Sequence, residues 1–151
     1  MIAALVVAVA VADADPCTLL TAAEISAAIG KPVPAMKPMG GSICTADASG
    51  IRVLVRVAKR TGPPDREAKG LEMIKKMGAQ VDFKKFGAAT CTSIAPPPAG
   101  AKSAALNTFN TTCSVLKDGT VAAVEITAKE QKDAVPIDRL GPLGEKLAAR
   151  F

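Results

Sequence analysis

Alternation of apolar and polar side chains predicts strands along most of the chain. In the range 51–58 every second residue is Ile or Val, the period of a strand with one buried face. The residues between them, Arg52, Leu54 and Arg56, therefore point to the opposite face. An Asp-Gly pair at 118–119 predicts a tight hairpin. The other strands predicted in this way are 43–46, 80–86, 88–94, 107–116 and 121–128.

Apolar residues three or four positions apart predict helices. Thr21 and Glu24 form a capping box, which starts a helix over 22–29 that Gly30 ends. A second helix is expected over about 66–77, and a third begins at one of two prolines and runs to the end of the chain. The expected buried stripe of the second helix is Leu71, Ile74 and Met77. The prolines and apolar stripe of the third are Pro136, Pro142, Leu140, Leu143, Leu147 and Phe151.

The order of these elements predicts the class of the fold. Helix, hairpin, helix, four strands and helix make an α+β domain. We expect an antiparallel sheet of about five to six strands, with two or three helices packed mainly on one face. The proline-rich segments 31–41 and 95–100 should be loops. Because no linker, repeat or low-complexity tract divides the chain, 15–151 should form a single domain.

The first residues predict export. The segment 2–12 is an unbroken apolar run of eleven residues, which suits a secretory signal but is shorter than the roughly 20 residues that span a bilayer. Ala12-Asp13-Ala14 has the small residues of a signal-peptidase site. We therefore expect 1–14 to be a signal peptide and the mature chain to begin near Asp15. The protein should be secreted or periplasmic and not an integral membrane protein.

The four cysteines indicate two disulfides. Cys17, Cys44, Cys91 and Cys113 are even in number and widely spaced, the pattern of an exported, cross-linked domain. Close pairs such as C-x-x-C, which zinc or redox sites use, do not occur. Four cysteines allow three pairings. We expect Cys17–Cys44 and Cys91–Cys113, because each pair closes a loop within one half of the chain.

Charge narrows the choice of partners. Removal of the leader would delete Asp13 from 14 acidic residues and raise the formal net charge from +5 to +6. This charge favours anionic neighbours such as envelope polymers or phospholipid head groups, although it also serves plain solubility. The partner that we expect is an anionic or amphipathic envelope ligand or a protein. Nucleic acid is not expected, because the basic pairs are scattered and no Trp or Tyr is present to stack on bases.

Composition also limits catalysis. The chain has no histidine, which excludes Ser-His-Asp and Cys-His catalysis and most zinc sites. A Ser-x-x-Lys pattern, Ser114 to Lys117, falls at the end of a predicted strand and not at a helix start. We therefore expect a protein that is not an enzyme and carries no cofactor. A small hydrolase or transferase that works without histidine is the alternative.

Two patterns mark candidate binding sites. Arg52, Leu54 and Arg56 share one strand face, and if no helix covers that face they could hold an anionic or amphipathic ligand. A solvated sheet face commonly carries the same residue types. Met36 and Met39 form an M-x-x-M pair in a loop, and thioethers are soft ligands that suit Cu(I). Ordinary apolar packing is the competing interpretation of the methionines.

The segment Asp15–Gly30 (DPCTLLTAAEISAAIG) resembles the mature N-terminus of a broad group of small bacterial envelope proteins. Their shared opening is D-P-C-x-L-L-(T/S)-x-x-E-(I/V)-x-x-x-(L/I)-G. The group includes secreted proteins and lipoproteins of actinobacteria and is similar to parts of the extracellular sensor domains of some mycobacterial serine/threonine kinases. The resemblance implies an envelope location and this type of fold, with ligand sensing as the function, and it assigns no functional residues. We therefore expect an exported, sensor-like domain that binds a ligand or partner at the cell envelope.

Overall fold

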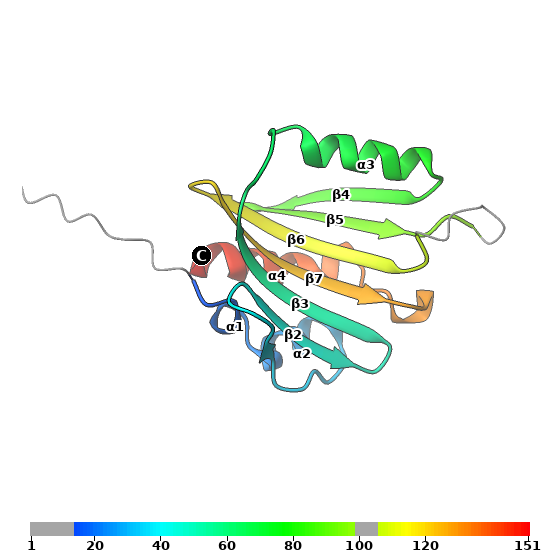
Figure 1. Ribbon diagram of the computed structural model, residues 1–151. Coiled ribbons are helices and arrows are strands. Elements are labelled where there is room, and N and C mark those ends of the chain that lie inside the picture. The colour runs from blue at the N-terminus through cyan, green and yellow to red at the C-terminus, as the bar shows by residue number, and fades with distance from the viewer. Residues whose placement is uncertain (1–13, 99–105) are drawn as a thin grey trace, which may run out of the picture.

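The alternating segments pair into one seven-stranded antiparallel sheet (Figure 1). The structure is a computed structural model and describes residues 14–98 and 106–151, so the expected signal peptide, 1–14, lies outside the described residues except for Ala14. The strands are β1 (Lys37–Pro38), β2 (Ile43–Ala48), β3 (Ile51–Lys59), β4 (Gln80–Phe86), β5 (Ala89–Ala95), β6 (Phe109–Lys117) and β7 (Thr120–Ala128). Their order across the sheet is β1-β2-β3-β7-β6-β5-β4.

The α+β class and the antiparallel sheet are confirmed, but five to six strands is too low a count. The additional strand is β1, which lies within the segment expected to be an irregular loop. Two residues are too few for an alternation to show. Pro38 is tolerated there because β1 is an edge strand that pairs only with β2.

Three helices contribute to the core of the domain. They are α1 (Pro16–Leu19), α2 (Ala22–Ile29) and α4 (Ile137–Arg150), and α4 lies against β5, β6 and β4. The stripe expected on the last helix is confirmed at Leu140, Leu143 and Leu147, which are at most 1% exposed. They share a core cluster with Val53 and Val55, the inward residues of β3. The helix count of two or three was also too low, since α1 is a single turn with no period to detect.

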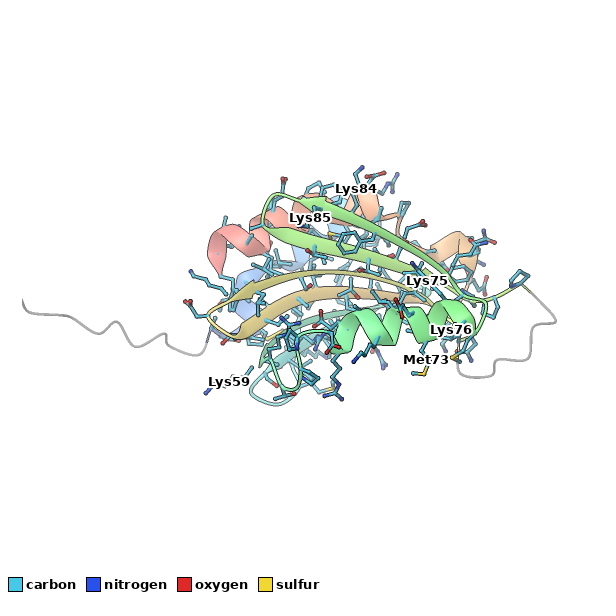
Figure 2. All side chains as sticks on the ribbon, turned by 90° about the horizontal axis from the view of Figure 1, so that it is seen from above. Lys59, Met73, Lys75, Lys76, Lys84 and Lys85 are labelled. Atoms are coloured by element: carbon cyan, nitrogen blue, oxygen red, sulfur yellow. A yellow bond between two sulfur atoms is a disulfide. The ribbon has the colours of Figure 1, made fainter. Side chains whose placement is uncertain are left out.

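The helix α3 (Arg66–Lys76) differs from expectation. It lies beside the edge strand β4, on the opposite side of the sheet from α4 (Figure 2). None of its residues is buried: Leu71 and Ile74 are half-buried, and Met77, just after the helix, is 39% exposed. The prediction of a buried stripe was therefore wrong. The amphipathic pattern is present, but α3 lies beside the edge strand β4, and all of its residues stay exposed or half-buried there.

Both predicted disulfides are confirmed. Cys17–Cys44 ties α1 to β2, and Cys91–Cys113 joins register partners on β5 and β6. Helix α4 crosses the second disulfide closely, because Gly144 faces it: a Cβ at Gly144 would lie 3.0 Å from the Cβ of Cys113. Two such cross-links are consistent with an oxidising compartment.

The capping box of α2 also fastens α4. Glu24 accepts a hydrogen bond from the backbone N–H of Thr21 (3.0 Å), as the sequence predicts. Its two carboxylate oxygens also accept hydrogen bonds from both terminal nitrogens of Arg150, at 2.7 and 2.6 Å, and one accepts from Lys146. The hydrogen bonds from Arg150, then from Thr21, hold the pKa of Glu24 well below its usual range.

We expect this network to contribute acid-sensitive stability. Because the pKa of Glu24 is lower in the folded chain than in the unfolded one, its contribution is complete above the ordinary value of 4.5 and is lost as the pH falls below it. Glu24→Gln should therefore lower stability at neutral pH and flatten the decline between pH 4.5 and pH 2, measured by urea unfolding across that range. The control Glu72→Gln, on the exposed surface of α3, should retain the decline due to Glu24. A parallel decline in the Glu24 variant would contradict this role.

Candidate functional site

The sheet face opposite α4 is open over β3, β7 and β6 (Figure 1). Arg52, Leu54 and Arg56 project from this face, because Val53 and Val55 between them are fully buried on the other. Among the residues that the structure describes, no helix covers this face at these three positions, so the condition set by the sequence is met there.

The two arginines of this strand have different surroundings. Arg52 pairs with Asp47 on β2, where its Nε donates to Oδ1 over 2.7 Å. This hydrogen bond raises the pKa of Arg52 and lowers that of Asp47. Arg52 lines a hollow of about 520 Å³ that also includes Lys129. Arg56 lines a different hollow, so the two arginines share a strand face but face separate hollows.

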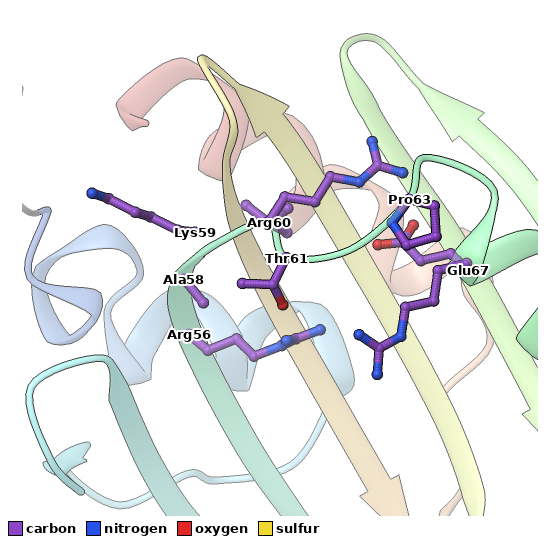
Figure 3. A pocket seen from close by; sticks show the side chains of 9 residues that line it. Arg56, Ala58, Lys59, Arg60, Thr61, Pro63 and Glu67 are labelled. Carbon is purple, nitrogen blue, oxygen red and sulfur yellow. The ribbon is translucent and has the colours of Figure 1, made fainter.

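Arg56 lines a hollow of about 410 Å³ between the end of β3 and the start of α3. Arg60 and Arg66 line it as well, so three of the six arginines in the chain meet there. Figure 3 shows Arg56 extending into the hollow from β3 and Glu67 from α3, whereas the side chain of Lys59 points away. We call the group Arg56, Arg60 and Arg66 the arginine pocket.

The arginine pocket has more positive than negative charge. Within the described ranges, none of its three arginines has a carboxylate within 4.0 Å. Arg60 donates to the carbonyl oxygen of Pro64 (2.7 Å), which uses one of its five N–H donors. Glu67 is the one acidic residue in the lining. Guanidinium groups that converge without carboxylate partners favour an anion, which they can bind through paired hydrogen bonds.

The turn between β3 and α3 brings the three arginines together. Gly62 has a φ of +93°, a conformation that glycine adopts readily, and two prolines follow it. The backbone N–H of Arg60 donates to the carbonyl oxygen of Gly119 in the β6–β7 turn (2.7 Å), which fastens this turn to the sheet. Arg56 therefore stands on a central strand, while Arg66 begins helix α3, which lies beside the edge strand β4.

Sequence reasoning missed Arg60 and Arg66. They lie on either side of the break at Thr61–Pro64, so no strand or helix pattern includes them with Arg56. The available signal was three arginines within eleven residues that span a Gly-Pro-Pro turn. The spacing alone does not predict a binding site, because the arginines meet only if the turn directs the chain back over the end of β3.

The other candidate residues lie beside β1 and on β6, outside the lining of the arginine pocket. Met36 is half-buried against the core and Met39 is 54% exposed, on either side of β1, and copper binding by this pair stays a prediction. Ser114 is half-buried on β6, and Lys117, at the end of the same strand, donates to the carbonyl oxygen of Phe151 (3.2 Å). In the part of the chain that the structure describes, no three His, Cys, Asp or Glu side chains gather as metal ligands.

The geometry defines an α+β domain with a partly open antiparallel sheet and an arginine pocket at the end of β3. No protein-family model matches the sequence, and no curated protein is significantly similar to it. Among residues 14–98 and 106–151, no helix has the length and apolar character needed to cross a membrane.

Proposed function

We propose that this chain is an exported, non-enzymatic domain of the cell envelope that binds an anionic ligand, or an anionic group of a partner, in the arginine pocket. The observation that supports this most is the meeting of Arg56, Arg60 and Arg66 without carboxylate partners in the described residues. By contrast, Arg52 and Arg150 do form ion pairs, and both lie outside the arginine pocket.

The proposal of export has a separate basis. The apolar run at 2–12, the disulfides and the resemblance of Asp15–Gly30 to envelope proteins all support it. The absence of histidine supports binding over catalysis, because arginines hold an anion well but are poor general bases.

We expect Arg56→Gln to weaken anion binding. Arg56 supplies charge-assisted hydrogen bonds of about 1.5–3 kcal/mol, so its loss should reduce affinity for inorganic phosphate about tenfold or more. Isothermal titration of the oxidised protein at low ionic strength measures this, and added salt should weaken binding further.

Arg52→Gln is the matched control. It makes the same change four residues away on the same strand face but outside the arginine pocket. It should bind phosphate as the unaltered protein does. If the two variants lost affinity equally, the pocket would not be the site. If the unaltered protein bound neither phosphate nor another small anion, the proposed function would be wrong.

A further inference from the structure

The floor of the arginine pocket is apolar. It includes Ala58 at the end of β3 and Val121 at the start of β7, which are register partners. Both lie on the open face: Ala58 is two positions along β3 from Arg56, and Val121 is two positions along β7 from Ala123, the register partner of Arg56. The arginine pocket therefore combines guanidinium groups with the apolar side chains of Ala58 and Val121 on the sheet.

The apolar floor continues beyond the pocket onto β6. Leu116 is the register partner of Val121, so the two Cβ atoms are expected about 4.5–5.5 Å apart. Leu116 is 51% exposed, so it extends the accessible apolar surface of the floor onto β6. The row Ala58–Val121–Leu116 thus leads from the arginines across three neighbouring strands.

The segment from β3 to α3 passes the same end of the sheet. Figure 1 shows it running from the end of β3 past the β6–β7 turn toward α3, and the hydrogen bond from Arg60 to Gly119 places it against that turn. A ligand with its anionic group at the arginines would have its remaining atoms directed along this row or into water. An inorganic anion would leave the apolar row unused.

We infer that the ligand of the arginine pocket is an amphiphilic phosphomonoester, with its phosphate at the three arginines and its hydrocarbon part on Val121 and Leu116. This inference rests on the proposed function and specifies its ligand class. A phosphomonoester carries nearly two negative charges at neutral pH, which matches three guanidinium groups offset by Glu67. The hollow of about 410 Å³ holds a head group and a few methylenes, within the range of small-molecule sites.

A series of monoalkyl phosphates tests the inference. Isothermal titration of the oxidised protein with inorganic, ethyl, butyl and hexyl phosphate, each below its aggregation concentration, gives affinity against chain length. A fully buried methylene contributes a factor of about four, and a chain covered on one side should gain about half of that free energy, or twofold per methylene. Hexyl phosphate should therefore bind tens of times more tightly than inorganic phosphate.

Two variants separate the head group from the chain. Leu116→Ser should remove most of the gain with chain length and leave the affinity for inorganic phosphate unchanged, and its folding can be checked by thermal unfolding. Arg56→Gln should weaken every member of the series by a similar factor. Hexanoate, with one negative charge, should bind less tightly than hexyl phosphate.

Results that contradict the ligand class can be told apart from results that contradict the proposed function. If inorganic phosphate binds at the arginines and hexyl phosphate binds no more tightly, the inference is overturned and the proposed function stands. A gain with chain length that survives both Leu116→Ser and Arg56→Gln would place the chain elsewhere and overturn it as well. If no member of the series binds, the inference and the proposed function fail together.

Discussion

Removal of the Cys17–Cys44 disulfide by the double replacement Cys17→Ala and Cys44→Ala should destabilise the oxidised protein by about 3–4 kcal/mol. The bond closes a loop with a sequence separation of 27, and the entropy that it removes from the unfolded chain gives this magnitude. Because Cys44 is fully buried, alanine is a better replacement than serine, whose hydroxyl would lack a hydrogen-bond partner in the core. Urea unfolding at neutral pH measures the loss.

The second disulfide supplies the control. In the double variant, reduction should cost only what Cys91–Cys113 contributes, whereas in the unaltered protein it should cost the sum of both bonds. If the free energy of unfolding of the double variant were less than about 1 kcal/mol below that of the unaltered protein, the Cys17–Cys44 disulfide would constrain the unfolded chain only slightly.

Leu143→Ala should be comparably damaging. Leu143 is 1% exposed between α4 and the sheet, and truncation of a buried leucine to alanine costs about 2–5 kcal/mol through lost burial and the cavity that remains. The effect should be near the upper end of that range if the disulfide Cys91–Cys113 beneath α4 prevents the sheet from moving to fill the space.

Leu116→Ala makes the same change on the open face. Leu116 is 51% exposed, so its truncation should alter stability by no more than about 0.5 kcal/mol. Thermal and urea unfolding of both variants give the comparison directly. Equal losses would mean that Leu116 is covered in solution, by α3 or by a second molecule.

Much of the fold follows from local patterns. The strand at 51–58 was predicted from its alternation, since Val53 and Val55 can lie on one face only if the arginines lie on the other. The capping box of Thr21 and Glu24 is also a local device. The pattern could not show which element of the fold packs against the apolar face of each helix. The stripe on α3 has the same period as that on α4, yet only α4 is covered by the sheet.

The candidate site was only partly predictable for the same reason. Arg56 was found because a strand gives every residue a definite face. Arg60 and Arg66 follow an irregular turn, where the direction of the chain depends on Gly62 and on the hydrogen bond to Gly119. The ion pair between Arg52 and Asp47 could not be predicted either. It depends on the register of β2 and β3, which the turn at 49–50 sets.

We propose that three arginines from a strand, a turn and a helix bind one anion together. The most direct test is a two-dimensional NMR spectrum of the arginine Nε–Hε groups during titration of the oxidised protein with inorganic phosphate. We predict that the signals of Arg56, Arg60 and Arg66 shift with one common dissociation constant, while those of Arg52 and Arg139 stay in place. Shifts of equal size at all of the arginines, or none at these three, would contradict the claim.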